Sequence, residues 1–282
     1  MPGWLPGSAG AIHEGAVVLE CVLNVSEGRS AEVLAALEAA AGEALLDRHT
    51  DPHHHRSVFT LVGEDAPRAV AAAAVEHLSL QGHEGVHPRI GVVDVVPFVP
   101  LGTTPMEEAV RARDAFARWA ADDLGVPCFL YGSQRTLPKL RRGAWTEIEP
   151  DVGGPSPHPT AGAMAVGARP VLVAYNLWLA EPDLAQAKAV AAAVRSDRLR
   201  TLGLPVGDRV QVSCNLVAPL EVGPADAWDA VAAQVEVAGA ELVGLVPEAV
   251  LHAADASRWG LLDLAEHRTI EARLAARGWG RT

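Results

Sequence analysis

Apolar and polar residues alternate along the first hundred positions in a way that predicts strands and helices in turn. Two stretches, at residues 31–41 and 67–80, carry apolar side chains at helical spacing, and Ser30 is placed to cap the first of them. Short β-branched or apolar runs predict four strands, at residues 16–22, 44–48, 57–63 and 92–96. The order strand, helix, strand, strand, helix, strand is that of the split βαβ unit of ferredoxin-like folds.

The pattern continues with one more helix and one more strand before it changes. Thr104 and Pro105 offer a cap and a first helical residue for a helix to about Leu124. Residues 126–131 then predict a strand that extends the first sheet. Residues 144–167 are rich in glycine and proline, so they predict a linker or a binding loop.

The second half of the chain predicts a further alternation of strands and helices. Expected strands lie at residues 171–175, 210–216 and 241–246, and expected helices at 184–194, 225–237 and about 264–276. If residues 202–204 add a short strand, this half repeats the order of the first. The predicted fold class is α+β, with two ferredoxin-like (split βαβ) subdomains. We expect a flexible tail at 1–15, an N-terminal subdomain at 16–166 and a C-terminal subdomain at 167–282.

Charge and cysteine content narrow the range of partners. The net charge of −12 over 282 residues, with a pI near 5.3, argues against a nucleic-acid or anionic-membrane partner, although a local basic site for an anionic substrate stays open. Cys21, Cys128 and Cys214 are far apart in apolar segments, which is typical of buried core residues. We find neither a signal-peptide pattern nor an apolar run of membrane-spanning length, so we expect a cytoplasmic protein.

The loop at residues 82–91 is the strongest candidate for chemistry. Three glycines and a proline keep its backbone irregular, so His87 and Arg89 cannot sit on a regular helical face. A neutral imidazole beside a fixed cation is a suitable proton acceptor near neutral pH. The alternative is that both residues only cap the helix end and solvate a turn.

A second polar loop joins the two strands before it. Asp47, Asp51, His55 and Arg56 are candidate substrate contacts, because a split βαβ unit brings this hairpin beside the strand that follows His87. The alternative is that the two aspartates accept turn hydrogen bonds and Arg56 pairs with them at the surface. Asp94, the sole ionisable residue in a run of valines, is either at a strand end or buried with a partner such as Arg89.

Seven of the eleven histidines lie between His49 and His87, so a metal site has to be considered. His53, His54 and His55 are consecutive and would point in different directions, so a zinc site is the lesser alternative and we predict no metal.

The third segment of interest combines glycines, which let backbone amides approach a flat ligand, with prolines, which keep it extended. Its residues are Gly153, Gly154, Pro155, Ser156, Pro157, His158, Pro159, Thr160, Ala161 and Gly162. The alternative is an inert interdomain linker.

Taken together, these segments resemble glutamate formiminotransferase, which is also the N-terminal half of formiminotransferase-cyclodeaminase. The resemblance covers nearly the whole chain beyond the tail, in order. It is carried by Cys21–Gly28, Asp47–Gly63, Gly85–Gly91 with Asp94–Phe98, Val126–Tyr131, Arg135–Lys139, Asp151–Gly167, Val173–Asn176, Gln211–Asn215 and Glu241–Pro247.

The resemblance implies two ferredoxin-like subdomains with a tetrahydrofolate cleft between them, usually in a homodimer. It implies transfer of a formimino group between N-formimino-L-glutamate and the N5 atom of tetrahydrofolate, in histidine breakdown. Tetrahydrofolate would be a co-substrate, and a glutamate-like amine the other small-molecule partner. The family's catalytic histidine falls on His87, and its folate-binding segment falls on Gly153–Gly162.

Two positions depart from the family pattern. Val86 stands where a glutamate commonly precedes the catalytic histidine, and His55 replaces an asparagine at the hairpin tip. Both lie near the expected amino-acid end of the site, so two alternatives stay open. The chain could be a related folate-binding one-carbon transferase acting on a different amine, or a catalytically inactive folate-binding homologue.

Overall fold

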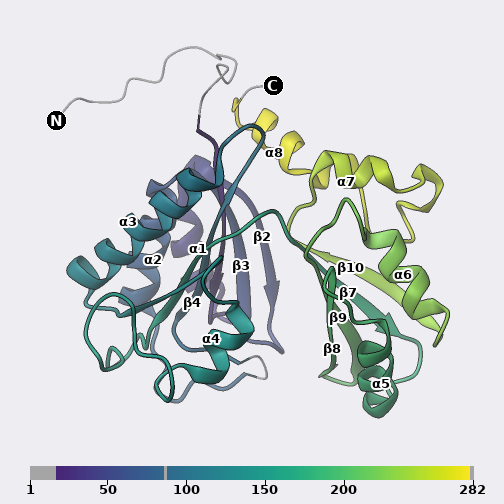
Figure 1. The fold of residues 1–282 in the computed structure, drawn as a ribbon, viewed down its shortest axis with the longest axis horizontal. Coiled ribbons are helices and arrows are strands. Elements are labelled where there is room, and N and C mark those ends of the chain that lie inside the picture. Colours follow the sequence, from purple (N-terminus) through teal and green to yellow (C-terminus); the bar gives the residue numbers. More distant parts are fainter. Residues whose placement is uncertain (1–16, 86–87, 280–282) are drawn as a thin grey trace.

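The computed structural model describes residues 17–85 and 88–279, and it contains two sheets that are covered by helices (Figure 1). Residues up to about 170 build the first lobe, purple to teal in the figure, and the rest build the second, green to yellow. Each lobe contains strands and helices in split βαβ order, so the predicted α+β fold class is confirmed.

The first lobe has a six-stranded sheet with the order β2-β3-β1-β4-β6-β5. Strands β2, β3, β1 and β4 are antiparallel neighbours, whereas β4, β6 and β5 are parallel. The elements are β1 (Leu19–Val25), α1 (Ala31–Ala41), the 3-10 turn η1 (Gly42–Ala44), β2 (Leu45–Asp51), β3 (Arg56–Val62), α2 (Asp65–His77), β4 (Val93–Pro100), α3 (Met106–Leu124), β5 (Cys128–Tyr131), α4 (Leu137–Gly143) and β6 (Met164–Ala168). In this sheet, α1, α2 and α3 cover one face and the short helix α4 packs on the other.

The period-two pattern of β1 explains how the helices cover this sheet. Leu19, Cys21, Leu23 and Val25 alternate along the strand and are buried in one core with apolar residues of α1, α2 and α3. The strand runs three residues beyond its predicted end at Val22, because its pairing with β3 continues to Val25. The three added residues bring Asn24 of β1 to the end of the sheet where the turn into α1 begins.

Strand β6 is the main correction to the sequence-based prediction. It lies within the segment that we expected to be a linker or loop, and it separates β4 from β5. Its sequence, Met-Ala-Val-Gly-Ala, contains one β-branched residue, Val166, which is a weak strand signal, and its stability comes from pairing on both sides. Gly167 is required there, because a Cβ would lie 2.2 Å from the ring of Tyr131. Thr104 was also wrongly expected to cap α3, since its hydroxyl accepts from the Val18 N–H instead.

The second lobe repeats the first unit in a four-stranded sheet with the order β10-β7-β9-β8. The expected extra strand is present, although the predicted limits of β7, α6 and β10 are wrong by up to five residues and the last helix begins only at Ile270. The elements are β7 (Val173–Leu179), α5 (Leu184–Val194), β8 (Leu199–Val206), β9 (Arg209–Leu216), α6 (Pro224–Ala232), β10 (Val237–Val243), α7 (Glu248–Ala253), the 3-10 turns η2 (Ala256–Arg258) and η3 (Glu266–Arg268), and α8 (Ile270–Ala276).

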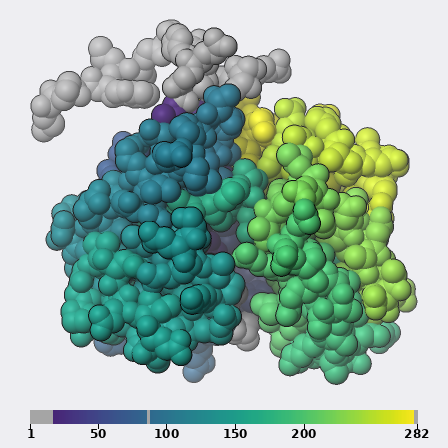
Figure 2. Space-filling view, in the orientation of Figure 1, coloured from purple at the N-terminus to yellow at the C-terminus, as the bar shows by residue number. Residues whose placement is uncertain are grey.

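The two lobes meet along one end of the first sheet. Leu46 and Val62 pack with Leu245, Ile270 and Leu274 in a small apolar cluster. Below this contact, a narrow groove separates the teal and green lobes (Figure 2). Among the described helices, none is both long and apolar enough to cross a membrane. The subdomain limits expected from the sequence stay a prediction, and β6 continues to Ala168.

Candidate functional site

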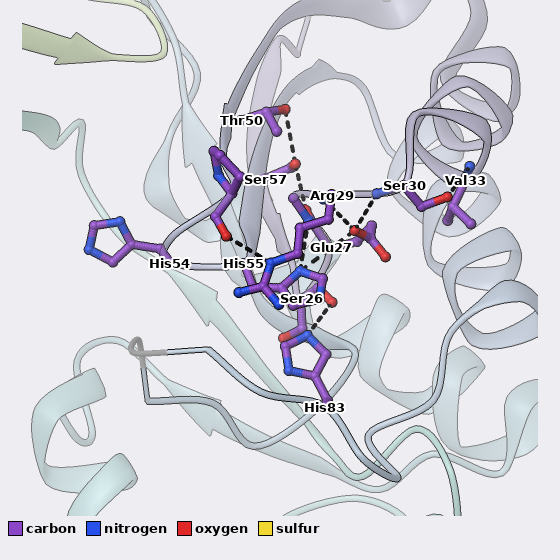
Figure 3. Close-up of polar contacts among 12 residues, drawn as sticks. Ser26, Glu27, Arg29, Ser30, Val33, Thr50, His54, His55, Ser57 and His83 are labelled. Carbon is purple, nitrogen blue, oxygen red and sulfur yellow. Dashed lines mark hydrogen bonds and ion pairs between the residues drawn. The ribbon is translucent and has the colours of Figure 1, made fainter. Parts of the chain in front are cut away.

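Three segments of the first lobe converge at the end of its sheet. They are the turn between β1 and α1, the tip of the β2–β3 hairpin, and the loop that leads into β4 (Figure 3). Gly28 brings the first two together, because a Cβ at this position would lie 2.4 Å from the carbonyl oxygen of Asp51. The Ser57 hydroxyl donates to the carbonyl of Glu27 over 2.6 Å, which ties β3 to the same turn.

Glu27 is a buried carboxylate at the start of α1. Its Oε1 accepts from the backbone N–H groups of Arg29 and Ser30, at 2.6 and 2.9 Å. These amides are among those that a helix leaves without a partner at its N-terminus. Arg29 in turn donates through Nε to the carbonyl of Pro52, at 2.9 Å, so this turn also holds the hairpin tip.

His55 fills the hairpin tip and faces Glu27. Its φ of 50° is left-handed, a conformation in which histidine and asparagine are enriched among non-glycine residues. Nδ1 accepts from the Gly28 N–H at 3.1 Å and lies 3.6 Å from Oε1 of Glu27. Burial, and then the neighbouring charge of His83, lower the pKa of the His55 imidazole. The ring is therefore neutral near pH 7, with its proton on Nε2.

His83 and Arg89 complete this cluster from the loop before β4. The ring of His83 stacks on that of His55, with centroids 4.2 Å apart and planes inclined by 27°. Its Nε2 donates to the carbonyl of Ser26 at 2.8 Å, which leaves Nδ1 to accept from the Arg89 guanidinium. Burial, and then the Arg89 charge, lower the pKa of His83. The cluster thus contains two stacked, neutral imidazoles.

Arg56 joins the hairpin to β1 and β4 instead of lying open at the surface. Its Nε donates to Oδ1 of Asn24 at 3.0 Å, and its Nη1 donates to Oδ2 of Asp94 at 2.6 Å. Asp94 is fully buried, and it also accepts from Nη2 of Arg141 at 2.6 Å. Burial raises the pKa of this carboxyl, but the charges of Arg56 and Arg141 outweigh burial and hold the pKa below its usual value. Of the two alternatives expected for Asp94, the structure shows the buried one, and its salt bridges join it to Arg56 and Arg141.

The two predicted aspartates of β2 have different environments. Asp51 organises the hairpin tip, because its Oδ1 accepts from the N–H groups of His53 and His54 and its Oδ2 contacts the His54 ring at 2.7 Å. These hydrogen bonds outweigh burial and lower the pKa of Asp51 to about 2. Asp47 lies four residues earlier on β2, about 13 Å away at strand spacing, where Arg273 of α8 is 3.6 Å from it. The structure therefore separates Asp47 from the other predicted contacts.

The predicted folate-binding segment lies beside the loop that carries Arg89. Thr160 and Ala161 accept through their carbonyls from the N–H groups of Leu80 and Val92, at 2.8 and 3.0 Å. Gly91 and Gly162 pair directly, and a Cβ on Gly91 would lie 1.9 Å from the carbonyl of Ala163. The remainder of the segment, residues 153–157, is exposed. The segment is thus anchored at its end and open at its start.

Val86 and His87 lie outside the described residues, so the catalytic role expected of His87 stays a prediction. Several described side chains at the site were not among the predicted contacts, including Asn24, Glu27, Arg29, His83 and Arg141. The turn-rich stretch after the first strand, the glycine-rich loop and the short basic stretch at 135–142 were the available signals. In the described part of the chain, no three or more His, Cys, Asp or Glu side chains are grouped to hold a metal ion.

Comparison with known proteins adds to this geometry. Residues 18–169 match the family model described as "Formiminotransferase domain, N-terminal subdomain". The chain is 34% identical over 272 residues to a glutamate formimidoyltransferase of Streptococcus pyogenes serotype M1, covering 84% of this chain and 91% of that protein. It is 32% identical over 275 residues to a protein of the same name from Thermoplasma acidophilum, covering 83% of this chain and 89% of the relative.

A formimidoyltransferase-cyclodeaminase of Gallus gallus is 35% identical over 287 residues, covering 85% of this chain but 52% of the longer relative. Both the family model and the extent of these matches agree with the motifs and the fold described above. The chain therefore belongs to the formiminotransferase domain family.

Proposed function

We propose that this protein moves a formimino group between N-formimino-L-glutamate and N5 of tetrahydrofolate, with His87 as the general base. The family makes the chain a transferase of formimidoyl groups, and the identity of the substrates and of the base is our proposal. The observation that carries it is that the predicted folate-binding segment and the loop containing Arg89 lie side by side, joined by three backbone hydrogen bonds between residues 80–92 and 160–163, two of which form the bridge between Gly91 and Gly162.

A concentration of guanidinium groups beside this loop supports an anionic substrate. Burial, and then the nearby charge of Arg56, lower the pKa of Arg89, and Arg29 and Arg141 contribute in the same direction. Four guanidiniums therefore gather in a chain whose net charge is −12. The described carboxylates beside them are Glu27, Asp51 and Asp94. Such a local excess of positive charge favours a substrate with two carboxylates, as glutamate has.

The reaction needs one proton to change place. The accepting nitrogen must have a free lone pair to form a bond with the formimino carbon, so a base removes its proton. The adduct collapses when the bond from that carbon to the donor nitrogen breaks, and the same base returns the proton to the departing nitrogen. His87 is followed directly by Pro88 and then by Arg89, and a guanidinium so near in the sequence disfavours a second positive charge, which favours the neutral, basic form of the imidazole.

The open start of the segment at 153–162 suits a flat ligand. Gly154 has no atom within 4 Å of the position that a Cβ would take, and residues 153–157 are exposed. We propose that this segment contacts tetrahydrofolate as co-substrate. From the same family resemblance, we propose a homodimer in the cytoplasm that acts in histidine breakdown; light scattering of the purified protein tests the dimer.

A different amine is the second candidate, and the histidine at position 55 favours it. An asparagine at that position would present an amide, whereas His55 presents a neutral ring stacked on His83. The reaction would be unchanged, but the group that recognises the amine would differ. Turnover with N-formimino-L-glutamate at a low KM would exclude this candidate, and folate binding without such turnover would favour it.

The test of the main proposal is transfer from N-formimino-L-glutamate to tetrahydrofolate by purified protein. We expect His87→Ala to lower kcat by at least about 100-fold, because a general base contributes that much or more. His77→Ala is the matched control, since His77 is exposed at the end of α2, and it should change kcat by less than about 2-fold. Equal activity of wild type and His87→Ala would contradict the assigned role.

A further inference from the structure

Two arginines from distant parts of the sequence hold one buried carboxylate beside the loop. Asp94 is 0% exposed, and its Oδ2 accepts from Arg56 and Arg141, each at 2.6 Å. Its Oδ1 accepts from the backbone N–H of Ile90 at 2.9 Å. A buried carboxylate with three charge-assisted or backbone donors is well satisfied, so its position is fixed.

Arg141 makes a second contact that Arg56 does not share. Its Nη1 donates to the carbonyl of Pro88, while its Nη2 donates to Asp94. One planar guanidinium therefore spans the two ends of residues 88–94. A lysine has a single nitrogen at its tip, so it cannot reproduce both contacts with the same geometry.

The helix that carries Arg141 is itself held firmly. Leu140 of α4 is 0% exposed and packs in a small core with Phe129 and Tyr131 of β5 and Val95 of β4. The Arg141 side chain is 18% exposed, so water reaches it only in part. On the other side, the loop is fixed by the Ala163 N–H, which donates to the carbonyl of Ile90 at 2.9 Å. Arg141 thus fixes the part of the loop nearest to His87 in sequence.

We propose that Arg141 is a positioning residue for the catalytic loop, because it binds Pro88 and Asp94 and so fixes residues 88–94, which follow His87 directly in the sequence. This inference rests on the proposed function, because it assumes that His87 is the base. A displacement of about 1 Å between a base and its substrate costs on the order of 100-fold in rate. Loss of Arg141 should therefore lower kcat, whereas KM should change little, because both Nη groups of Arg141 bind protein atoms and its charge is shared with Asp94.

Two variants and one control test this role. Arg141→Met removes both donors but keeps the apolar stem, and Arg141→Lys keeps the charge without the fork. Arg142→Met is the matched control, because Arg142 is the exposed next residue of the same helix and carries the same charge. Steady-state kinetics of formimino transfer are combined with amide hydrogen exchange of the peptide spanning residues 83–93.

We expect Arg141→Met to lower kcat by about 10- to 100-fold with less than about a 3-fold change in KM, and Arg141→Lys to lie between it and wild type. Exchange in the 83–93 peptide should accelerate in Arg141→Met and stay unchanged in peptides of the second lobe. Unchanged exchange in that peptide would overturn the proposal, as would a loss expressed only in KM. If the wild type does not transfer formimino groups, the proposed function fails, and exchange alone still decides whether Arg141 fixes the loop.

Discussion

The two lobes share one topology but differ in the polar side chains that they bury. In the described chain, the buried charged residues are Glu20, Glu27, Asp94 and Arg113, and all of them lie in the first lobe. The buried polar residues of the second lobe are neutral: Thr201, Gln211 and Thr269. Burying a charge is costly unless it is paired and hydrogen-bonded. The buried charged side chains of the described chain therefore all belong to the lobe that contains the candidate site.

The equivalent hairpins show the same difference. In the second lobe, β8 and β9 are joined by a two-residue turn in which Gly207 has a φ of 62°. This turn consists of Gly207, which has no side chain, and Asp208, and a Cβ at Gly207 would lie 2.9 Å from the His53 ring of the first lobe's hairpin. In the first lobe, β2 and β3 are joined by four residues, 52–55, which Asp51 holds through two backbone amides. A longer tip with an internal acceptor can present imidazoles, and the shorter turn cannot.

Removing the buried carboxylate should have the largest effect. Asp94→Ala leaves Arg56 and Arg141 buried without their shared partner, so we expect the free energy of unfolding to fall by about 3–5 kcal/mol. The matched control is Asp229→Ala in the second lobe, where Arg258 binds Asp229 at 2.6 Å but the carboxylate is 61% exposed. That change should cost less than about 1 kcal/mol. Urea denaturation measures both, and equal losses would contradict the contrast between the lobes.

A methyl group added at the convergence of the segments should have an intermediate effect. In Gly28→Ala, the new Cβ would meet the backbone of Asp51 and Arg56, which cannot move as a flexible side chain can. We expect a loss of about 1–3 kcal/mol in the free energy of unfolding. Gly239→Ala on β10 is the control, because no atom lies within 4 Å of the new Cβ, and it should be neutral within about 0.5 kcal/mol. A loss in the control as large as in Gly28→Ala would refute the steric explanation.

Local patterns predicted the elements well and the contacts between distant segments less well. The strand and helix order of both lobes and the place of Arg56 at the hairpin could be predicted, because each depends on neighbouring residues. β6 could not, since four of its five residues are not β-branched and it forms a strand only between β4 and β5. Arg141 could not either, because 47 residues separate it from Asp94 and periodicity reports only the face of one element.

The smallest expected effect concerns the two stacked imidazoles and their response to pH. Burial lowers the pKa of His55 and of His83 from 6.5, so the folded protein binds protons at these rings less readily than the unfolded chain does. Stability from the neutral rings is therefore complete above about pH 6.5 and is lost as the pH falls through the lowered values. Three charged groups face these rings. Glu27 raises the pKa of both rings and so opposes the effect of burial, whereas Arg89 lowers the pKa of both and Arg29 lowers that of His55.

His55→Asn should weaken this acid-side loss, because it removes one of the two titrating rings. The matched control, His252→Asn on α7, should leave the dependence as in wild type, since that ring is 55% exposed in the second lobe. Urea denaturation at a series of pH values from 5 to 8 gives the slope of the unfolding free energy for each protein. A slope that His55→Asn leaves unchanged would mean that the tip histidine is not held neutral by its contacts with Gly28 and His83, and the first lobe would then resemble the second in its response to acid.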